Sequence, residues 1–260
     1  MLAVTRYPSV EADDNQPWLV FLHGLLGDGH DWDAVLPHLN HWSCITIDLP
    51  GHGQSQDISV NGFEHLSQQL GETLLSCNIN RYILIGYSLG GRCAMYHTCF
   101  GESDGLVGLA IEGGNPGLNA DSERQARLHH DSRWAEQFRH QSLPEVLAQW
   151  YQQPVFANLN DESRQRLILR RHHNDGHHVA QMLESTSLGC QPQLGERLNT
   201  RLKHRNIPFC YLCGEQDAKF QQIALENHFP LRIVAAAGHN AHSANPEGFA
   251  AQLLTFLKEC

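Results

Sequence analysis

Apolar residues along this chain gather in short runs, each about as long as one buried strand. The runs alternate with segments that have the 3.6-residue periodicity of amphipathic helices. Strands that alternate with helices in this way predict a parallel sheet with right-handed crossovers. The predicted strands are residues 18–22, 43–47, 81–85, 106–111, 208–212 and 231–235, and the predicted helices are residues 62–76, 91–100, 220–228 and 246–257.

One long stretch interrupts this alternation. Residues 116–195 contain no strand-like run, are rich in Arg, His, Gln and Trp, and have helical periodicity. We therefore expect a core formed by residues 1–115 and 196–260, with a helical cap inserted at residues 116–195. The cap helices are expected at residues 121–141, 144–152, 161–174 and 179–187.

A five-residue motif lies between the strand at 81–85 and the helix that follows it. Gly86, Ser88 and Gly90 form a G-x-S-x-G sequence at this position. In that setting the motif is typical of the nucleophile elbow of α/β-hydrolases, a strained turn that exposes its serine at the carboxyl end of the sheet. Glycines suit the turn because strand and helix approach closely there. The sequence thus predicts an α/β-hydrolase fold, with a mostly parallel sheet, flanking helices and the helical cap above Ser88.

A serine hydroxyl needs a histidine that takes its proton, and that histidine needs an acid. In this fold the acid follows the serine in the chain, and the histidine follows the acid. Asp217, after the strand at 208–212, is the preferred acid, with Glu215 as a near rival and Glu112 as a weaker one. The alternative for each is a solvated surface carboxylate.

The histidine is expected after the last strand, where the sequence offers His239 and His242. His239 directly follows Gly238, which is the usual position, so we prefer it as the catalytic base. His242 is expected to be a loop residue or the start of a helix.

Stabilisation of an oxyanion requires backbone donors beside the serine. The segment His23-Gly24-Leu25 follows the first predicted strand, so the N–H groups of Leu25 and Leu89 are the candidate donors. Each such donor contributes about 3 kcal/mol to transition-state stabilisation. We expect His23 to anchor the loop through hydrogen bonds without reacting itself.

Arg92 lies four residues after Ser88, in the first turn of a helix, where a cation opposes the helix dipole. A guanidinium placed there favours an anionic substrate, because it binds carboxylates in a bidentate fork. The alternative is a salt bridge to a core carboxylate. The segment at 150–156 is aromatic. It either lines the binding site of a ring-shaped substrate or forms a satellite core. Further cap arginines are Arg124, Arg127, Arg133, Arg164, Arg166, Arg170 and Arg171.

Composition excludes several classes of function. The chain has 260 residues, 41% of them hydrophobic, and its apolar runs are too short for a membrane span. A net charge of −10 without a basic block argues against nucleic acid and anionic membranes as partners. The start of the chain does not resemble a signal peptide.

Eight cysteines without disulfide or zinc spacing favour a reducing cytoplasm, and we read Cys210 and Cys213 as core thiols on opposite strand faces. The paired histidines at 172–173 and 177–178 flank a predicted turn, and we expect no metal site there.

Seven segments together resemble the bacterial menaquinone-pathway family of 2-succinyl-6-hydroxy-2,4-cyclohexadiene-1-carboxylate synthases. The hydrolase motifs among them are general, whereas the strings at 150–156 and 213–220 are specific to that family. The segments are residues 20–24, 48–53, 86–92, 112–118, 150–156, 212–220 and 237–242.

The resemblance implies a lyase that needs no cofactor and no metal, and whose partner is a small polyanionic substrate. Ser88, with His239 and Asp217, would abstract a ring proton, the oxyanion donors would hold charge on the succinyl carbonyl, and pyruvate would be eliminated. The family's substrate-binding residues correspond to Arg92, Arg127, Arg171, Tyr87, Trp150 and Tyr151, with Arg124 as a substitute for Arg127.

Two alternatives remain open at this point. A serine carboxylesterase or acyl-CoA thioesterase would use the same residues to form an acyl-enzyme. A catalytically silent receptor would retain its function without Ser88. A monomer is the expected form.

Overall fold

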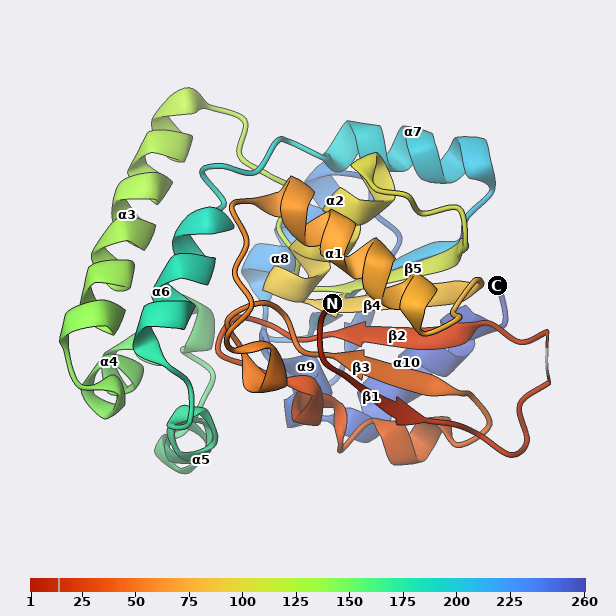
Figure 1. The fold of residues 1–260 in the computed structure, drawn as a ribbon, viewed down its shortest axis with the longest axis horizontal. Coiled ribbons are helices and arrows are strands. Elements are labelled where there is room, and N and C mark those ends of the chain that lie inside the picture. Colours follow the sequence, from red (N-terminus) through yellow and green to blue (C-terminus); the bar gives the residue numbers. More distant parts are fainter. Residues whose placement is uncertain (14) are drawn as a thin grey trace.

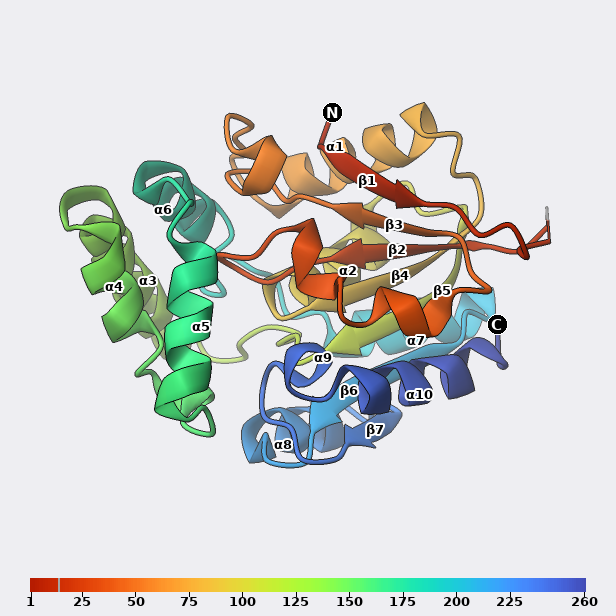
Figure 2. The ribbon, with the colours of Figure 1, turned by 90° about the horizontal axis from the view of Figure 1, so that it is seen from below.

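The computed structural model describes residues 1–13 and 15–260. Seven strands form one sheet in the order β1-β3-β2-β4-β5-β6-β7, and every neighbouring pair except β1·β3 is parallel (Figures 1 and 2). The predicted mostly parallel sheet with flanking helices is confirmed. The strands are β1 (Val4–Tyr7), β2 (Trp18–Leu22), β3 (Cys44–Ile47), β4 (Tyr82–Tyr87), β5 (Leu106–Glu112), β6 (Phe209–Gly214) and β7 (Leu231–Val234).

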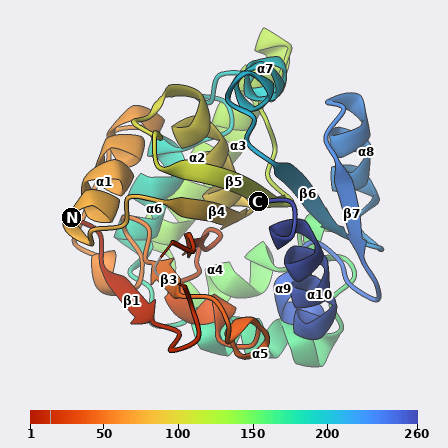
Figure 3. The same cartoon turned by 90° about the vertical axis from the view of Figure 1, so that its right-hand side faces the viewer.

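Helices cover both faces of the sheet. On one face α1 (Phe63–Ser76), α2 (Leu89–Phe100) and α7 (Gly195–Arg205) pack over an apolar core, and on the other face α9 (Ala241–Ala244) and α10 (Pro246–Leu257) pack over a second one (Figure 3). Helix α8 (Ala218–Glu226) connects β6 to β7. Cys213 lies in the first core and Cys210 in the second, so the prediction of core thiols on opposite strand faces is confirmed.

Four helices lie between β5 and α7 in the chain and stand beyond the carboxyl ends of the parallel strands (Figures 1 and 2). They are α3 (Asp121–His140), α4 (Leu143–Trp150), α5 (Asp161–Arg171) and α6 (Gly176–Ser185). They bury a third apolar cluster that includes Phe138, Val146 and Leu183.

The boundary between the third and fourth of these helices differs from the prediction. Helix α5 ends at Arg171, and α6 begins at Gly176 instead of 179. The cause is Asp175, whose carboxylate accepts the N–H groups of His177 and His178 and so caps α6. The Asn174 amide donates to the Leu26 carbonyl at 3.0 Å, which fixes the turn against the core.

Strand β1 and helix α7 are among the elements that were not predicted. Strand β1 has only four residues, and its central Thr5 and Arg6 are exposed, so it lacks an apolar run. Helix α7 is strongly polar, and Leu198 and Leu202 are its buried apolar residues, one helical turn apart. None of the described helices combines the length and apolar character that a bilayer span requires.

Candidate active site

Ser88 occupies a strained turn between β4 and α2. Its φ is 49° and its ψ is −107°, a conformation that L-residues rarely adopt. The flanking glycines permit the close packing of this turn: a Cβ on Gly86 would lie 2.5 Å from the Gly90 carbonyl oxygen, and one on Gly90 would lie 2.4 Å from the Leu22 carbonyl oxygen. The Ser88 N–H donates to the Glu112 carbonyl at 2.8 Å, which ties the turn to β5.

The structure brings Ser88, His239 and Asp217 together. His239 Nε2 lies 3.3 Å from Ser88 Oγ, and His239 Nδ1 lies 2.9 Å from Asp217 Oδ2. Because the Asp217 carboxylate accepts a hydrogen bond from Nδ1–H, Nε2 is left free to accept the serine proton. The Phe220 ring stacks on the imidazole with 4.4 Å between centroids, which further fixes its plane.

The rival residues lie elsewhere. Glu215 is exposed and accepts the Ala236 N–H at 3.0 Å. Glu112 is 1% exposed and pairs with the buried His242, so the alternative of a solvated surface carboxylate is wrong for Glu112. His242 is the second residue of α9, in agreement with its expected place at a helix start.

Two buried histidines hold the loop that carries Leu25. His23 Nε2 accepts the Leu49 N–H at 2.9 Å and its Nδ1 faces the Gly24 carbonyl at 2.7 Å, while His52 Nε2 accepts the Leu26 N–H at 3.0 Å. The Leu25 N–H makes no hydrogen bond within the described part of the chain. Leu89 is the first residue of α2, where an N–H has no acceptor within the helix. Both proposed oxyanion donors are therefore available.

A cavity of about 630 Å³ opens beside Ser88 and His239. One part of its wall is apolar and aromatic and comes from Trp150, Val155 and Phe156. Another part carries Arg127, His130 and Lys219. The cavity can therefore take a molecule that combines a ring with negatively charged groups.

Arg92 is buried, and no carboxylate in the described residues 1–13 and 15–260 forms an ion pair with it. Its Nε donates to the Gln191 amide oxygen at 2.7 Å, another N–H donates to the Thr186 carbonyl, and its guanidinium lies 5.2 Å from the Phe63 ring centroid. The alternative of a salt bridge to a core carboxylate is therefore wrong for Arg92. Burial, and then the nearby Arg127, lowers the pKa of Arg92 to about 10. Arg92 does not line the cavity, so its contact with substrate stays a prediction.

Arg127 and Lys219 face the cavity from opposite parts of the fold. Arg127, on α3, binds both oxygens of Asp131 through its Nε at 2.8 Å. Lys219, on α8, is exposed at the cavity wall and has no hydrogen bond or ion pair in the described part of the chain. Partial burial, and then the charge of Arg127, lowers the pKa of Lys219. Sequence reasoning missed Lys219, although it is the second residue of its helix and so opposes the helix dipole, as Arg92 does.

The other predicted binding residues are distributed differently. Arg171 is buried in an ion pair with Asp31, with nitrogen–oxygen distances of 2.6 and 2.8 Å, and this pair fastens α5 to the core. Tyr87 and Tyr151 are buried as well. Of the six substrate-binding residues that the resemblance implies, Arg127 and Trp150 line the cavity. The roles of Arg171, Tyr87 and Tyr151 toward a substrate stay predictions.

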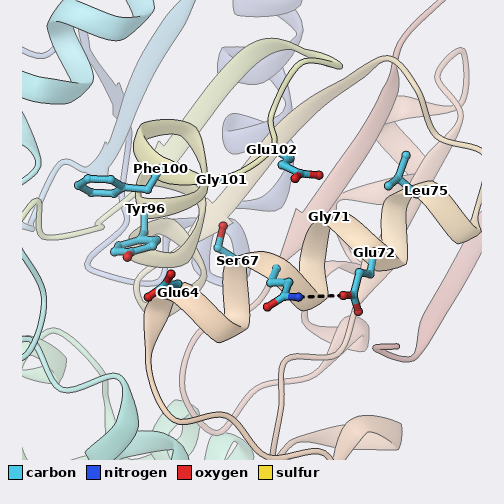
Figure 4. Close-up of a pocket in the computed structure, with 10 residues that line it drawn as sticks. Glu64, Ser67, Gly71, Glu72, Leu75, Tyr96, Phe100, Gly101 and Glu102 are labelled. Atoms are coloured by element: carbon cyan, nitrogen blue, oxygen red, sulfur yellow. Dashed lines mark hydrogen bonds between the residues drawn. The ribbon is translucent and has the colours of Figure 1, made fainter.

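A second cavity, of about 560 Å³, lies between α1 and α2 (Figure 4). Its wall carries the carboxylates of Glu64, Glu72 and Glu102. These charges repel an anion, and the cavity contains none of the residues around Ser88. In the described part of the chain, no group of three or more His, Cys, Asp or Glu side chains is placed to hold a metal ion.

Comparison with known proteins gives consistent matches. The family model described as "alpha/beta hydrolase fold" matches residues 17–246. The chain is 54% identical over 242 residues to the 2-succinyl-6-hydroxy-2,4-cyclohexadiene-1-carboxylate synthase of Pectobacterium atrosepticum, covering 93% of this chain and 94% of that protein. It is 53% identical to the protein of the same name from Yersinia enterocolitica, covering 94% of this chain and 87% of that protein.

Solved structures agree with this result. The structure of MenH from S. aureus superposes with a TM-score of 0.88 at 28% identity, and the match covers 98% of both chains. A thermophilic esterase from Thermogutta terrifontis superposes with a TM-score of 0.80 at 19% identity over 99% of this chain and 93% of the esterase, a level that shows the common fold alone.

Proposed function

This chain belongs to the family of 2-succinyl-6-hydroxy-2,4-cyclohexadiene-1-carboxylate synthases within the α/β-hydrolases, and from that premise we propose that it eliminates pyruvate from 2-succinyl-5-enolpyruvyl-6-hydroxy-3-cyclohexene-1-carboxylate in the menaquinone pathway. One observation carries the proposal: the Ser88–His239–Asp217 arrangement opens on a cavity with two cations on its wall. A substrate with several carboxylates matches those cations. Its ring matches the aromatic wall beside Trp150.

In the proposed reaction the serine acts as a base. His239 takes the Ser88 proton, and the Ser88 oxygen removes a ring proton next to the succinyl carbonyl. The electron pair of that C–H bond moves toward the carbonyl, whose oxygen accepts hydrogen bonds from the Leu25 and Leu89 N–H groups. The electrons then return to form a double bond between ring atoms C2 and C3. The electron pair of the original C3=C4 double bond moves to C4–C5, and the C5–O bond to enolpyruvate breaks, which leaves the 2,4-diene. A proton from His239 or water converts the leaving enolate to pyruvate.

The basic groups near the cavity supply the attraction that a chain of net charge −10 lacks at long range. Arg127 lies close enough to both Arg92 and Lys219 for its charge to lower the pKa of each. Asp131 already pairs with Arg127, whereas Lys219 has no ion pair in the described part of the chain, so a substrate carboxylate would supply the anion that Lys219 lacks. The segment 116–195, which we propose as a functional cap, contributes Arg127 and Trp150 to this wall. All eight cysteines are free thiols, which supports the proposed cytoplasmic location.

Pyruvate release from the enolpyruvyl substrate, followed with lactate dehydrogenase, tests the proposal. We expect rapid release by the unaltered protein and a loss of at least about 10³-fold in Ser88→Ala. Mass spectrometry of the protein during turnover should show no adduct on Ser88. A stable acyl group on Ser88, or no pyruvate, would refute the lyase and favour the carboxylesterase or thioesterase.

A further inference from the structure

A second acid–histidine pair lies directly behind the triad. His242 Nδ1 lies 2.8 and 3.0 Å from the two carboxylate oxygens of Glu112, and the His242 backbone N–H donates to Oε1 at 3.1 Å. The side chains are 1% and 3% exposed, and neither residue lines the cavity beside Ser88. The pair is therefore outside the reach of a substrate.

Glu112 is bonded to both segments that carry the reacting groups. It is the last residue of β5, and its carbonyl oxygen accepts the Ser88 N–H at 2.8 Å. Its carboxylate binds His242, which lies three residues after His239 in the short helix α9 that follows the His239 loop. One residue thus links the elbow to the histidine loop, through its main chain on one side and its side chain on the other.

The surroundings leave this linkage little freedom. The Tyr87 ring lies 4.5 Å from the His242 ring and 5.4 Å from the His239 ring, and the Trp32 ring covers His242 at 4.7 Å. Gly113, next to Glu112, has a φ of +57°, and a Cβ there would lie 2.7 Å from His239 Cε1. The end of β5 therefore packs directly against the catalytic imidazole. In such a dry setting, hydrogen bonds to a charged carboxylate are strong.

We propose that Glu112 and His242 are a positioning pair that sets the separation of His239 and Ser88. The inference rests on the proposed function in taking Ser88 and His239 as the reacting groups. The pair touches neither substrate nor the reacting atoms. Displacement of a base by about 1 Å costs a catalytic step about 10²-fold, so the expected effect is on kcat and not on KM.

Three substitutions separate positioning from general stability. Glu112→Gln preserves volume but replaces one acceptor oxygen with a donor. His242→Leu removes the ring donor, whereas His242→Asn keeps an N–H donor near the position of Nδ1. Glu215→Gln is the matched control, because this exposed carboxylate also accepts a backbone N–H from the histidine loop, at Ala236.

The reporter is the rate at which a fluorophosphonate modifies Ser88, measured beside pyruvate release. Phosphonylation depends on the contact between Ser88 and His239, but not on the elimination. For Glu112→Gln and His242→Leu we expect both this rate and kcat to fall about 10- to 100-fold, with KM within about threefold. His242→Asn and Glu215→Gln should stay within about threefold of the unaltered protein, and Ser88→Ala should not react.

Folded Glu112→Gln that reacts at the unaltered rate would overturn the inference. If Glu112→Gln does not fold, the comparison of His242→Leu with His242→Asn tests the inference instead. Equal rates of Ser88 phosphonylation in these two variants would overturn it. An unaltered Ser88 that does not react with the probe would overturn both the positioning pair and the proposed function. If the probe rates follow the expected order but no pyruvate is released, the proposed function alone fails.

Discussion

Lowering the pH from 7 to 5 should weaken the loop that carries Leu25, because His52 fits its site only as the neutral imidazole. His52 is fully buried, its Nε2 accepts the Leu26 N–H at 3.0 Å, and its Nδ1 lies 2.9 Å from the Pro50 carbonyl oxygen. A proton on Nε2 would place the His52 Nε2–H donor against the Leu26 N–H donor. Burial, and then the neighbouring His23, lowers the pKa of His52 from 6.5 to about 3.

The sign and size of the effect follow from that pKa. Between pH 6.5 and about 3 the unfolded chain binds a proton on this residue that the folded chain does not, so stability falls as the pH falls. Each pH unit costs about 1.4 kcal/mol, which gives about 2 kcal/mol at pH 5. His97, whose pKa burial lowers to about 4, adds a similar amount at that pH.

Urea unfolding at pH 7, 6 and 5 measures this effect. His52→Gln retains an acceptor for the Leu26 N–H, so we expect it to cost about 1 kcal/mol at pH 7 and to reduce the pH slope by about 1.4 kcal/mol per unit. His38 is exposed, and His38→Gln should keep the unaltered slope. Equal slopes in the unaltered protein and His52→Gln would refute the argument.

Three further predictions concern the elbow, the cavity and the cap. Gly90→Ala should destabilise the protein by about 3 kcal/mol or more in urea unfolding, because its Cβ would lie 2.4 Å from the Leu22 carbonyl oxygen. A cost below about 1 kcal/mol would contradict the elbow packing. Lys219→Met should raise KM in the pyruvate assay about tenfold while kcat changes less than about threefold, and an equal rise in KM for a neutral ester would contradict an anion-binding role. Asp31→Ala leaves Arg171 buried without its carboxylate partner and should lower the free energy of unfolding by about 3–5 kcal/mol in the same urea measurement. A loss within about 1 kcal/mol would show that the pair does not hold the cap.

Short-range backbone geometry allowed much of this protein to be predicted from its sequence. The run of apolar residues in β4, followed by glycines around Ser88, indicates a strand, a tight turn and a helix, because each depends on neighbouring residues alone. The opposite faces of Cys210 and Cys213 follow in the same way from the two-residue period of a strand. The short, exposed strand β1 has no such local pattern, and its position depends on pairing with β3.

Tertiary structure alone decided which polar groups meet. Arg92 and Arg171 look equivalent in the sequence, yet one is buried against neutral oxygens and the other against Asp31. Glu112 and His242 lie 130 positions apart, and nothing local to either predicts their contact. A charged side chain is buried only where a distant part of the chain supplies compensating partners, so its environment is set by the whole fold and not by its neighbours in sequence.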